Sequence, residues 1–257
     1  MKLSLTAIEG IPLIEPGDNL VEIILEGIHQ SDEDILDKDI LIIAQKIISK
    51  TENRYVELHS VTPSKEAEEL AKEVDKDPRY VELVLRESRE VVRKKPGVLI
   101  VEHKLGFVHA NAGIDQSNIE HKNDNERVLL LPEDPDSSAE KIRLELKKRF
   151  NIDVGVIIND SVGRAWRNGT MGLAIGIAGM AALDDRTGSH DIFGRELKVT
   201  SAAVADELAA AASLIMGQTT EKTPVVLARG FHPAPVADNS ETGIKPLIRE
   251  KNMDLFR

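Results

Sequence analysis

The chain has no cysteine and very few aromatic residues. Among its 257 residues there is no Cys, and Phe, Trp and Tyr together account for 3%. The lack of cysteine excludes disulfide bridges, zinc-thiolate sites, iron-sulfur clusters and thiol nucleophiles. Any bound metal must therefore use oxygen or imidazole ligands, and the core must be built from aliphatic side chains.

Long apolar runs and an excess of positive charge are also missing. No segment approaches the roughly 20 apolar residues of a bilayer-spanning helix, and the first 20 residues lack the apolar run of a secretory signal. We therefore expect a soluble, cytoplasmic protein with no membrane partner. The 33 basic and 44 acidic residues give a formal net charge of -11, which would repel a phosphate backbone and predicts no nucleic-acid partner. An anionic ligand would need local arginine, lysine or metal.

Several common enzyme motifs are absent as well. The sequence contains no GxxxxGK[ST], no strand-linked GxGxxG, no HExxH and no GxSxG. Predicted strands and helices alternate irregularly, which favours an α+β fold of mixed β-sheets with flanking helices over a Rossmann or P-loop fold. The length is compatible with a single domain over residues 1–257 or with two intertwined subdomains that share one active site.

Apolar and capping patterns predict the individual elements. Residues 39–50 have the β-branched density of a strand with a polar far end. Ser64 can cap a helix over residues 65–74, and Asp77 with Pro78 can begin a helix that continues to residue 95. Ser137 and Glu140 form a capping box for a further helix, and Ser201 and Gly217 are the predicted start and end of another. A loop is predicted over residues 106–118. Strands are predicted over residues 98–103, 154–160, 171–183 and 224–230.

Two acidic residues in separate segments are candidate metal ligands. Asp160 follows an apolar strand and precedes Ser161, so a carboxylate and a hydroxyl oxygen meet there, as magnesium and manganese sites prefer. Asp115 lies in a loop of small residues, and two carboxylates can share cations that neutralise phosphate oxygens. The structural alternatives are a helix cap or turn at Asp160 and Ser161, and an Asx-turn at Asp115.

The single tryptophan of the chain, Trp166, stands between two arginines. Arg164 and Arg167 can hold a carboxylate or phosphate in a fork, and the indole offers a stacking face to a planar ring. These arginines are therefore candidate catalytic residues that grip anionic substrates. In the alternative interpretation, Trp166 is a core anchor and the arginines solvate its rim.

Lysines and a polar loop could meet a nucleotide. Lys46 and Lys50 are four residues apart, and in an extended segment both would point to one face and toward phosphates; a solvated strand end explains them equally well. The loop over residues 216–223 supplies neutral oxygens and amides, but it also fits an ordinary helix C-cap and turn. His109 and His232 fit structural and catalytic roles equally.

Taken together, these segments resemble the coenzyme F420-0:L-glutamate ligase family. The matching stretches are GIPLI from Gly10, AQKIISK from Ala44, ANAGIDQSN from Ala110, INDSVGRAWRNG from Ile158, AIG from Ala174, DELAAAASLIMGQ from Asp206 and PVVLARG from Pro224. The resemblance covers residues 10 to 230. The chain departs from the pattern at Ser161, where threonine is expected, and at Ala165, where proline is expected.

The resemblance implies a GTP-dependent ligase that joins L-glutamate to coenzyme F420-0 and adds a second glutamate through a γ-linkage. It also implies two divalent cations (Mg²⁺ or Mn²⁺), K⁺ and a homodimer. Carried onto this sequence, it makes Asp115 and Asp160 ligands of one divalent cation, with Ser161 and Gln218 serving the other. The implied GTP site consists of Ile11, Pro12, Leu13, Ile14, Gln45, Lys46, Lys50, Asn118, Met216, Gly217, Gln218, Thr219, Thr220, Glu221, Lys222 and Thr223.

The chemistry of such a reaction requires an activated carboxylate. Phosphoryl transfer from GTP would produce an acyl phosphate, which the glutamate amine attacks with release of phosphate, leaving GDP as the other product. No protein nucleophile is needed. The competing hypotheses are another metal-dependent, nucleotide-using amide ligase or a kinase, and a non-catalytic GTP-binding regulator.

Overall fold

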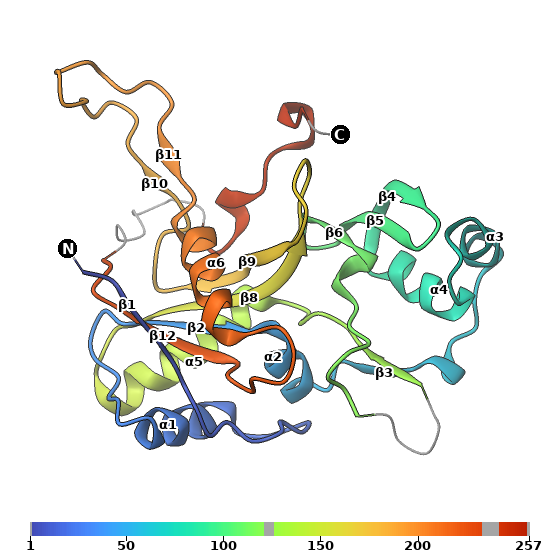
Figure 1. The fold of residues 1–257 in the computed structure, drawn as a ribbon, viewed down its shortest axis with the longest axis horizontal. Helices are drawn as coiled ribbons and strands as arrows, with labels where there is room; N and C mark the ends of the chain where they lie inside the picture. The colour runs from blue at the N-terminus through green and yellow to red at the C-terminus, as the bar shows by residue number, and fades with distance from the viewer. Residues whose placement is uncertain (1, 121–125, 233–241, 256–257) are drawn as a thin grey trace.

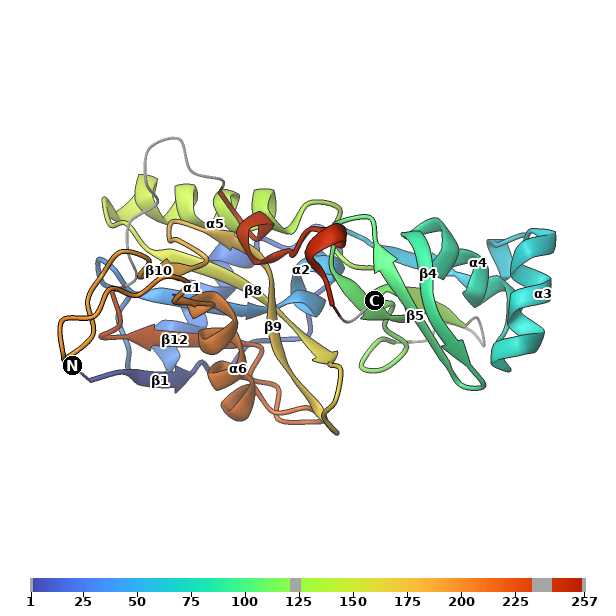
Figure 2. The ribbon, with the colours of Figure 1, turned by 90° about the horizontal axis from the view of Figure 1, so that it is seen from above.

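The computed structural model describes residues 2–120, 126–232 and 242–255 (Figure 1). The fold is α+β, as predicted, with mixed and antiparallel sheets and flanking helices. Buried apolar side chains form two clusters, one around the main sheet and a second made by residues between Leu58 and Leu130. The molecule is elongated, and the chain segments that carry the smaller cluster lie at one end of its long axis (Figure 2).

A five-stranded sheet organises the larger part of the chain. Its strands, in spatial order, are β1 (Ser4–Ala7), β12 (Val225–Arg229), β2 (Ile40–Ala44), β8 (Gly155–Gly163) and β9 (Thr170–Ala178). β2 and β8 run parallel, and the other neighbours are antiparallel. The central strands are continuous apolar runs because both faces of the sheet are covered.

Two helices cover opposite faces of this sheet (Figure 2). They are α5 (Pro135–Phe150) and α6 (Val204–Met216), and α1 (Leu20–Gln30) packs near α5. α6 approaches β9 very closely at Gly172, where a Cβ atom would lie 2.1 Å from Ser213 Oγ and 2.3 Å from the carbonyl oxygen of Ala209. Small residues on both elements therefore set the distance between helix and sheet.

The smaller part of the chain combines short helices with two small sheets. One is the antiparallel sheet of β4 (Ser88–Lys95), β5 (Val98–His103) and β6 (Val108–Ala110), and the other pairs β3 (Tyr55–Glu57) with β7 (Arg127–Leu129). The helical elements are α3 (Lys65–Val74), α4 (Pro78–Arg86), and the short 3-10 turns η1 (Leu58–Ser60) and η2 (Asn111–Gly113). β6 contacts β8, so this part adjoins the main sheet.

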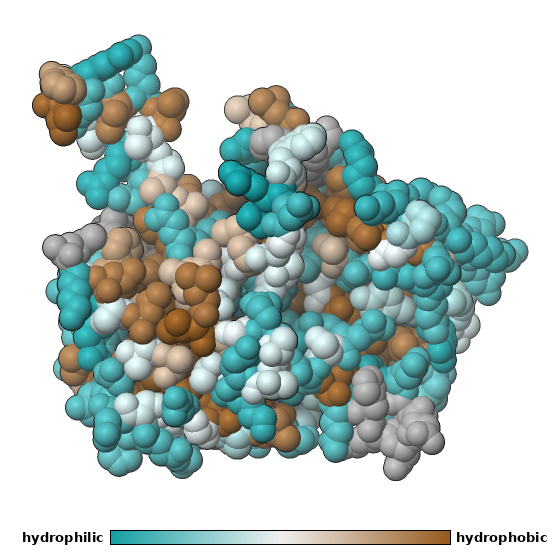
Figure 3. Space-filling model, viewed as in Figure 1, coloured by the Kyte–Doolittle hydropathy of each residue, from teal (hydrophilic) through white to brown (hydrophobic). Residues whose placement is uncertain are grey.

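An arm and a C-terminal segment extend from the main sheet. The arm begins and ends with the paired strands β10 (Asp184–Asp185) and β11 (Ser201–Ala202), and η3 (Lys245–Leu247) and η4 (Lys251–Met253) follow near the C-terminus. Ile192 and Phe193, in the arm, are 92% and 89% exposed, and Figure 3 shows brown, hydrophobic atoms at the end of the arm. In the part of the chain described here, no helix has the length and apolar character needed to cross a bilayer.

Two segments that were each predicted as one element contain both a helix and a strand in the structure. The strand predicted over residues 39–50 ends at Ala44, and Gln45–Thr51 is the helix α2. The buried positions Gln45, Ile48 and Ser49 follow helical spacing, so the period changes where the pairing of β2 with β8 ends. The helix predicted from Pro78 ends at Arg86, and Ser88–Lys95 is β4, which pairs with β5. Long-range pairing overrides helix propensity there.

The predicted helix starts were right at two positions and wrong at two others. Ser64 caps α3 by accepting from the amide of Ala67, and Asp77 with Pro78 begins α4. In contrast, α5 begins with Asp134 as its N-cap, where a carboxylate takes the role predicted for Ser137. Ser201 belongs to β11, and α6 begins after Ala203, while Gly217 ends it as predicted.

Candidate active site

Parallel pairing brings several polar segments to one edge of the main sheet. Ala44 at the end of β2 lies opposite Asn159 of β8, so the residues that follow them, Gln45 and Asp160, both reach this edge. β12 runs antiparallel to β2, so the loop before it reaches the same edge. β8 extends past the end of β2 to Gly163. Asp160 therefore lies inside the strand, whereas the sequence predicted it as the last residue of a strand over 154–160. In the described chain, β8 pairs there with β9 alone.

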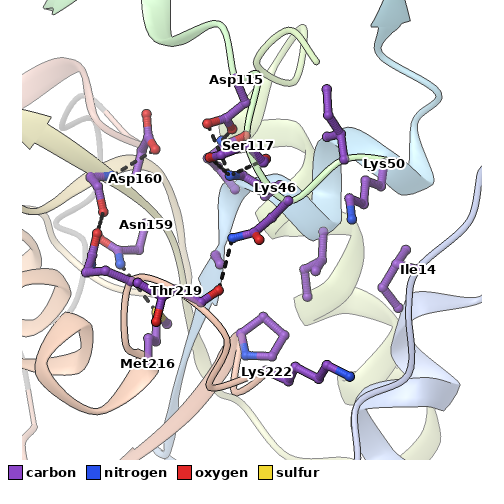
Figure 4. Close-up of a pocket in the computed structure, with 18 of the residues that line it drawn as sticks. Ile14, Lys46, Lys50, Asp115, Ser117, Asn159, Asp160, Met216, Thr219 and Lys222 are labelled. Atoms are coloured by element: carbon purple, nitrogen blue, oxygen red, sulfur yellow. Dashed lines mark hydrogen bonds and ion pairs between the residues drawn. The ribbon is translucent and has the colours of Figure 1, made fainter. Parts of the chain in front are cut away.

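A pocket of about 830 Å³ opens at this edge and is lined by both parts of the chain (Figure 4). Asp160 lies at one end, Asp115 and Lys46 lie in the middle, and Lys50 lies toward the other end with Ile14. The residues predicted for the nucleotide and metal sites all line it, namely Ile11, Pro12, Leu13, Ile14, Gln45, Lys46, Lys50, Asp115, Asn118, Asp160, Ser161, Met216, Gly217, Gln218, Thr219, Thr220, Glu221, Lys222 and Thr223. The volume is that of a nucleotide-sized ligand site.

Asp115 is held from its backbone and its side chain. Its backbone amide donates to the Leu129 carbonyl at the end of β7, and its carbonyl accepts from the Leu129 amide. Its carboxylate accepts from Gln45 Nε2 at 2.5 Å and lies 3.2 Å from Lys46 Nζ. Gln45 is only 3% exposed, and Ser49 donates to its Oε1 at 2.9 Å, which turns the amide nitrogen toward Asp115. The first turn of α2 therefore orients this carboxylate.

Asp160 is held by the other part of the chain. Its Oδ1 accepts from the backbone amide of Ser161 at 2.8 Å, and its Oδ2 lies 3.1 Å from Nε2 of His109 in β6. Burial lowers the pKa of His109, but the hydrogen bond and charge of Asp160 and the bond to the Ala110 carbonyl outweigh it and raise the pKa. Each carboxylate oxygen thus has one fixed partner and retains a lone pair for another ligand.

The loop from Met216 to Thr223 closes one side of the pocket. Ser161 Oγ donates to Gln218 Oε1 at 3.0 Å, and Asn118 Nδ2 donates to the Thr219 carbonyl at 3.2 Å, so both parts of the chain contact this loop. Thr223 also donates to the last carbonyls of α6. The loop is therefore a helix C-cap and turn, and it lines the pocket as well.

The charges in the pocket act on one another. Burial raises the pKa of Asp115, Lys46 opposes this shift, and the charge of Asp160 raises the pKa further. Burial and the charge of Lys46 lower the pKa of Lys50. The two carboxylates are thus close enough to repel each other, and the two lysines also repel each other. A cation beside the carboxylates and an anion beside the lysines would relieve both repulsions.

The donor set at the carboxylate end suits hard divalent cations. Asp115 and Asp160 supply carboxylate oxygens, Ser161 a hydroxyl oxygen and Gln218 an amide oxygen, which are the ligands that Mg²⁺ and Mn²⁺ prefer. Within residues 2–120, 126–232 and 242–255, no group of three or more His, Asp or Glu side chains is arranged to hold a metal ion. Cations at this end would therefore depend on neutral oxygens and on ligand phosphates for the rest of their coordination.

The predicted arginines lie apart from this pocket. Arg164 and Arg167 are exposed in the turn between β8 and β9, and neither is among the described residues that line the pocket. Arg164 donates to the Gly169 carbonyl at 3.1 Å and so closes the turn. Trp166 is 85% exposed with φ +64°, which excludes the alternative of a core anchor. The turn is thus a surface feature of the single chain.

Sequence patterns missed several residues of the site. His109 is 8% exposed and contacts Asp160, whereas His232 is exposed, so only the structure distinguishes two histidines whose sequence context fits both roles equally. Tyr55 and Arg127 also line the pocket, with the Arg127 guanidinium 4.1 Å from the Tyr55 ring centroid. No local pattern marks these residues, because each reaches the site through long-range pairing.

Comparison with known proteins agrees with the resemblance in the sequence. The sequence model of the F420-0:Gamma-glutamyl ligase family matches residues 10–230. The chain is 44% identical over 257 residues to the coenzyme F420:L-glutamate ligase of Methanothermobacter thermautotrophicus, with both chains fully covered. It is 46% identical over 249 residues to the ligase of that name from Methanocaldococcus jannaschii, covering 96% of this chain and 94% of the relative. The relative of that name from Archaeoglobus fulgidus is 40% identical over 257 residues, covering 100% and 97%.

Proposed function

Because the chain belongs to the F420-0:gamma-glutamyl ligase family, we propose that it is a GTP-dependent ligase that adds L-glutamate to coenzyme F420-0. A second glutamate follows through a γ-linkage, and each addition releases GDP and phosphate. GTP is the co-substrate, and two divalent cations (Mg²⁺ or Mn²⁺) and K⁺ are required.

One observation carries the proposal of a metal-dependent phosphoryl transfer. Two carboxylates 45 residues apart in the sequence, Asp115 and Asp160, line the same pocket as two lysines, and their charges interact. Lys46 and Lys50 would bind the phosphates of GTP, with the loop of residues 216–223 beside them. The carboxylate end would hold the reacting phosphate through its cations, which neutralise charge on the phosphoryl oxygens when bound.

The side chains of the pocket account for the remaining steps. Gln45 orients Asp115, and Lys46 stabilises negative charge as the terminal phosphoryl group moves to the carboxylate of coenzyme F420-0. The resulting acyl phosphate is attacked by the amine of L-glutamate, and phosphate leaves. The sequence contains no cysteine, and this route requires no nucleophile from the protein.

Two further parts of the proposal concern the surface. A homodimer would cover the exposed apolar side chains Ile192 and Phe193 at the arm, which are unusual on the surface of a monomer. Arg164 and Arg167 remain candidates for holding anionic substrates, and in this chain they would act from the exposed turn that follows Asp160 in β8.

Mass spectrometry of the product tests the proposal most directly. The purified protein is incubated with coenzyme F420-0, L-glutamate, GTP, Mn²⁺ and K⁺, and the acceptor should gain the mass of one and then two glutamyl groups. Asp160→Ala should abolish this gain while the protein stays folded, because a ligand of the cation is lost. Near-normal turnover of that variant would contradict the metal role of Asp160.

The same assay separates the competing functions. Release of GDP or ADP with a different acid acceptor would indicate another amide ligase, and a phosphorylated acceptor without glutamate would indicate a kinase. Binding of GTP without any turnover in the presence of acceptor and Mn²⁺ would indicate a non-catalytic regulator. The acceptor panel is therefore run with both GTP and ATP.

A further inference from the structure

A partly buried hydrogen bond joins the two parts of the chain at the carboxylate end of the pocket. His109 lies in β6, paired with Val101 of β5, and Asp160 lies in β8 of the main sheet. Nε2 of His109 is 3.1 Å from Oδ2 of Asp160. Since 51 residues separate the pair in sequence, this contact exists only in the assembled fold.

Both nitrogens of the His109 ring have a hydrogen-bond partner. Its Nδ1 lies 2.8 Å from the Ala110 carbonyl oxygen, so both ring nitrogens already have acceptor partners. Phe107 packs edge-on against the ring with centroids 6.4 Å apart, and Phe107 is in turn stacked on His103 at 5.2 Å. His109 is 8% exposed. Because packing and the second hydrogen bond fix the His109 ring, its Nε2 donor holds the Asp160 carboxylate in one orientation.

The chain that follows His109 leads directly to the other carboxylate. Asn111, Ala112 and Gly113 have φ values of 52°, 54° and 67°, so three consecutive residues are left-handed before the chain reaches Asp115. Left-handed backbone is unfavourable for a residue with a Cβ atom such as Ala112, so the surrounding structure must hold this turn in place. His109 therefore anchors, on Asp160, the strand from which Asp115 is delivered.

From these contacts we infer that His109 is a positioning residue, which aims the Asp160 carboxylate at a shared divalent cation and fixes its separation from Asp115. This inference rests on the proposed function, because it presupposes that both carboxylates bind the cation. His109 itself does not contact the substrates in this role. Losing such an outer partner of a metal ligand typically weakens metal binding about 10- to 100-fold.

Binding of Mn²⁺ to the full-length protein, followed by the electron paramagnetic resonance signal of free Mn²⁺, tests this role. His109→Leu should raise the dissociation constant for Mn²⁺ about 10-fold or more. His109→Gln should retain most of the affinity, because its terminal amide can donate from the position of Nε2. The matched control is His103→Leu, which removes the other buried imidazole of the same ring stack and should leave the Mn²⁺ affinity within about twofold.

A purely structural role gives a different result. In that case His109→Leu and His103→Leu would lower the melting temperature alike and would bind Mn²⁺ alike, which would overturn the inference. If His109→Leu fails to fold, the comparison uses His109→Gln and His109→Asn, because the shorter amide of Asn cannot reach Asp160. Equal Mn²⁺ affinities of these two variants would also overturn it.

A reference variant separates this inference from the proposed function. Asp160→Asn removes a proposed ligand directly and should abolish both Mn²⁺ binding at this site and ligation. Unchanged binding and ligation in Asp160→Asn would contradict the metal site itself. If Asp160→Asn loses Mn²⁺ binding and ligation while His109→Leu binds Mn²⁺ with wild-type affinity, the metal site stands and only the role of His109 is contradicted.

Discussion

Ser161 Oγ donates a hydrogen bond to Gln218 Oε1 at 3.0 Å, so a hydroxyl of β8 meets an amide of the loop after α6. The two residues are 57 positions apart in sequence, and both line the pocket. Under the proposed function they serve the second cation. Their direct contact places two neutral oxygens together, which is an arrangement suited to a hard cation beside phosphate.

The Ser161 hydroxyl should be required, whereas the additional methyl group of a threonine at this position should not matter. Ser161→Ala removes the oxygen and is expected to raise the concentration of Mn²⁺ needed for half-maximal ligation about 10-fold or more. Ser161→Thr keeps the oxygen and should stay within about threefold of the wild type. Steady-state rates at varied Mn²⁺ measure both variants. Equal metal dependence of Ala and Thr variants would rule out Ser161 as a ligand.

Binding of GTP should weaken as the pH rises, and Lys50 should contribute to this loss. Burial and Lys46 lower the pKa of Lys50, with Arg127 acting in the same direction and Glu15 and Asp115 opposing them. A lysine contributes to phosphate binding only while protonated, so its contribution is complete at low pH. It is lost on raising the pH through a value below the ordinary lysine pKa.

Arginine at position 50 should remove this part of the pH dependence, because a guanidinium stays charged throughout the range. The measurement is the dissociation constant of a non-hydrolysable GTP analogue between about pH 7 and pH 10, within the range where amines titrate. Lys222→Arg, on the exposed loop of the same pocket, is the matched control. A parallel loss of affinity in wild type and Lys50→Arg would contradict the assignment.

Substitution of Gly172 should destabilise the fold strongly for so small a change. A Cβ atom there would lie 2.1 Å from Ser213 Oγ, 2.3 Å from the Ala209 carbonyl oxygen and 2.6 Å from Asn159 Oδ1. Gly172→Ala must push α6 away from β9, and it should lower the free energy of unfolding by about 1–3 kcal/mol. Urea denaturation measures this difference.

Gly163 provides the control for that substitution. It lies in β8 of the same hairpin, and within the described part of the chain no atom comes within 4 Å of a Cβ placed there. Gly163→Ala should therefore change the free energy of unfolding by no more than about 0.5 kcal/mol, as for other surface substitutions. Similar losses for both alanine variants would show that steric contact with α6 is not the cause.

The exposed apolar residues of the arm should matter for self-association. The double substitution Ile192→Ser and Phe193→Ser removes two large apolar side chains that the single chain leaves exposed. If the proposed homodimer buries them, the mass measured by light scattering after gel filtration should fall toward that of one chain on dilution. Leu144→Ser, at a half-exposed position of α5, is the control and should leave the mass unchanged. An unaltered dimer in the double variant would place the interface elsewhere.

Local chemistry was sufficient to predict some elements of the fold. Ser64 and Asp77 with Pro78 begin helices where predicted, because a cap acts on amides only two or three residues away. The strand over residues 98–103 was also predicted correctly. The prediction was wrong at residues 45–51 and 88–95, because burial against partners distant in sequence decides between helix and strand there.

The sequence by itself determined that the core is aliphatic, that no thiolate can take part in the chemistry, and that carboxylates, lysines and a polar loop follow apolar segments. Only the tertiary structure decided which of these groups meet. The parallel pairing of β2 with β8 brings Gln45 and Asp160 to the same edge of the sheet, and the contact between β6 and β8 gives Asp160 its partner His109. A side chain's orientation depends on the packing and hydrogen bonds around it, and for this site those partners come from distant parts of the chain.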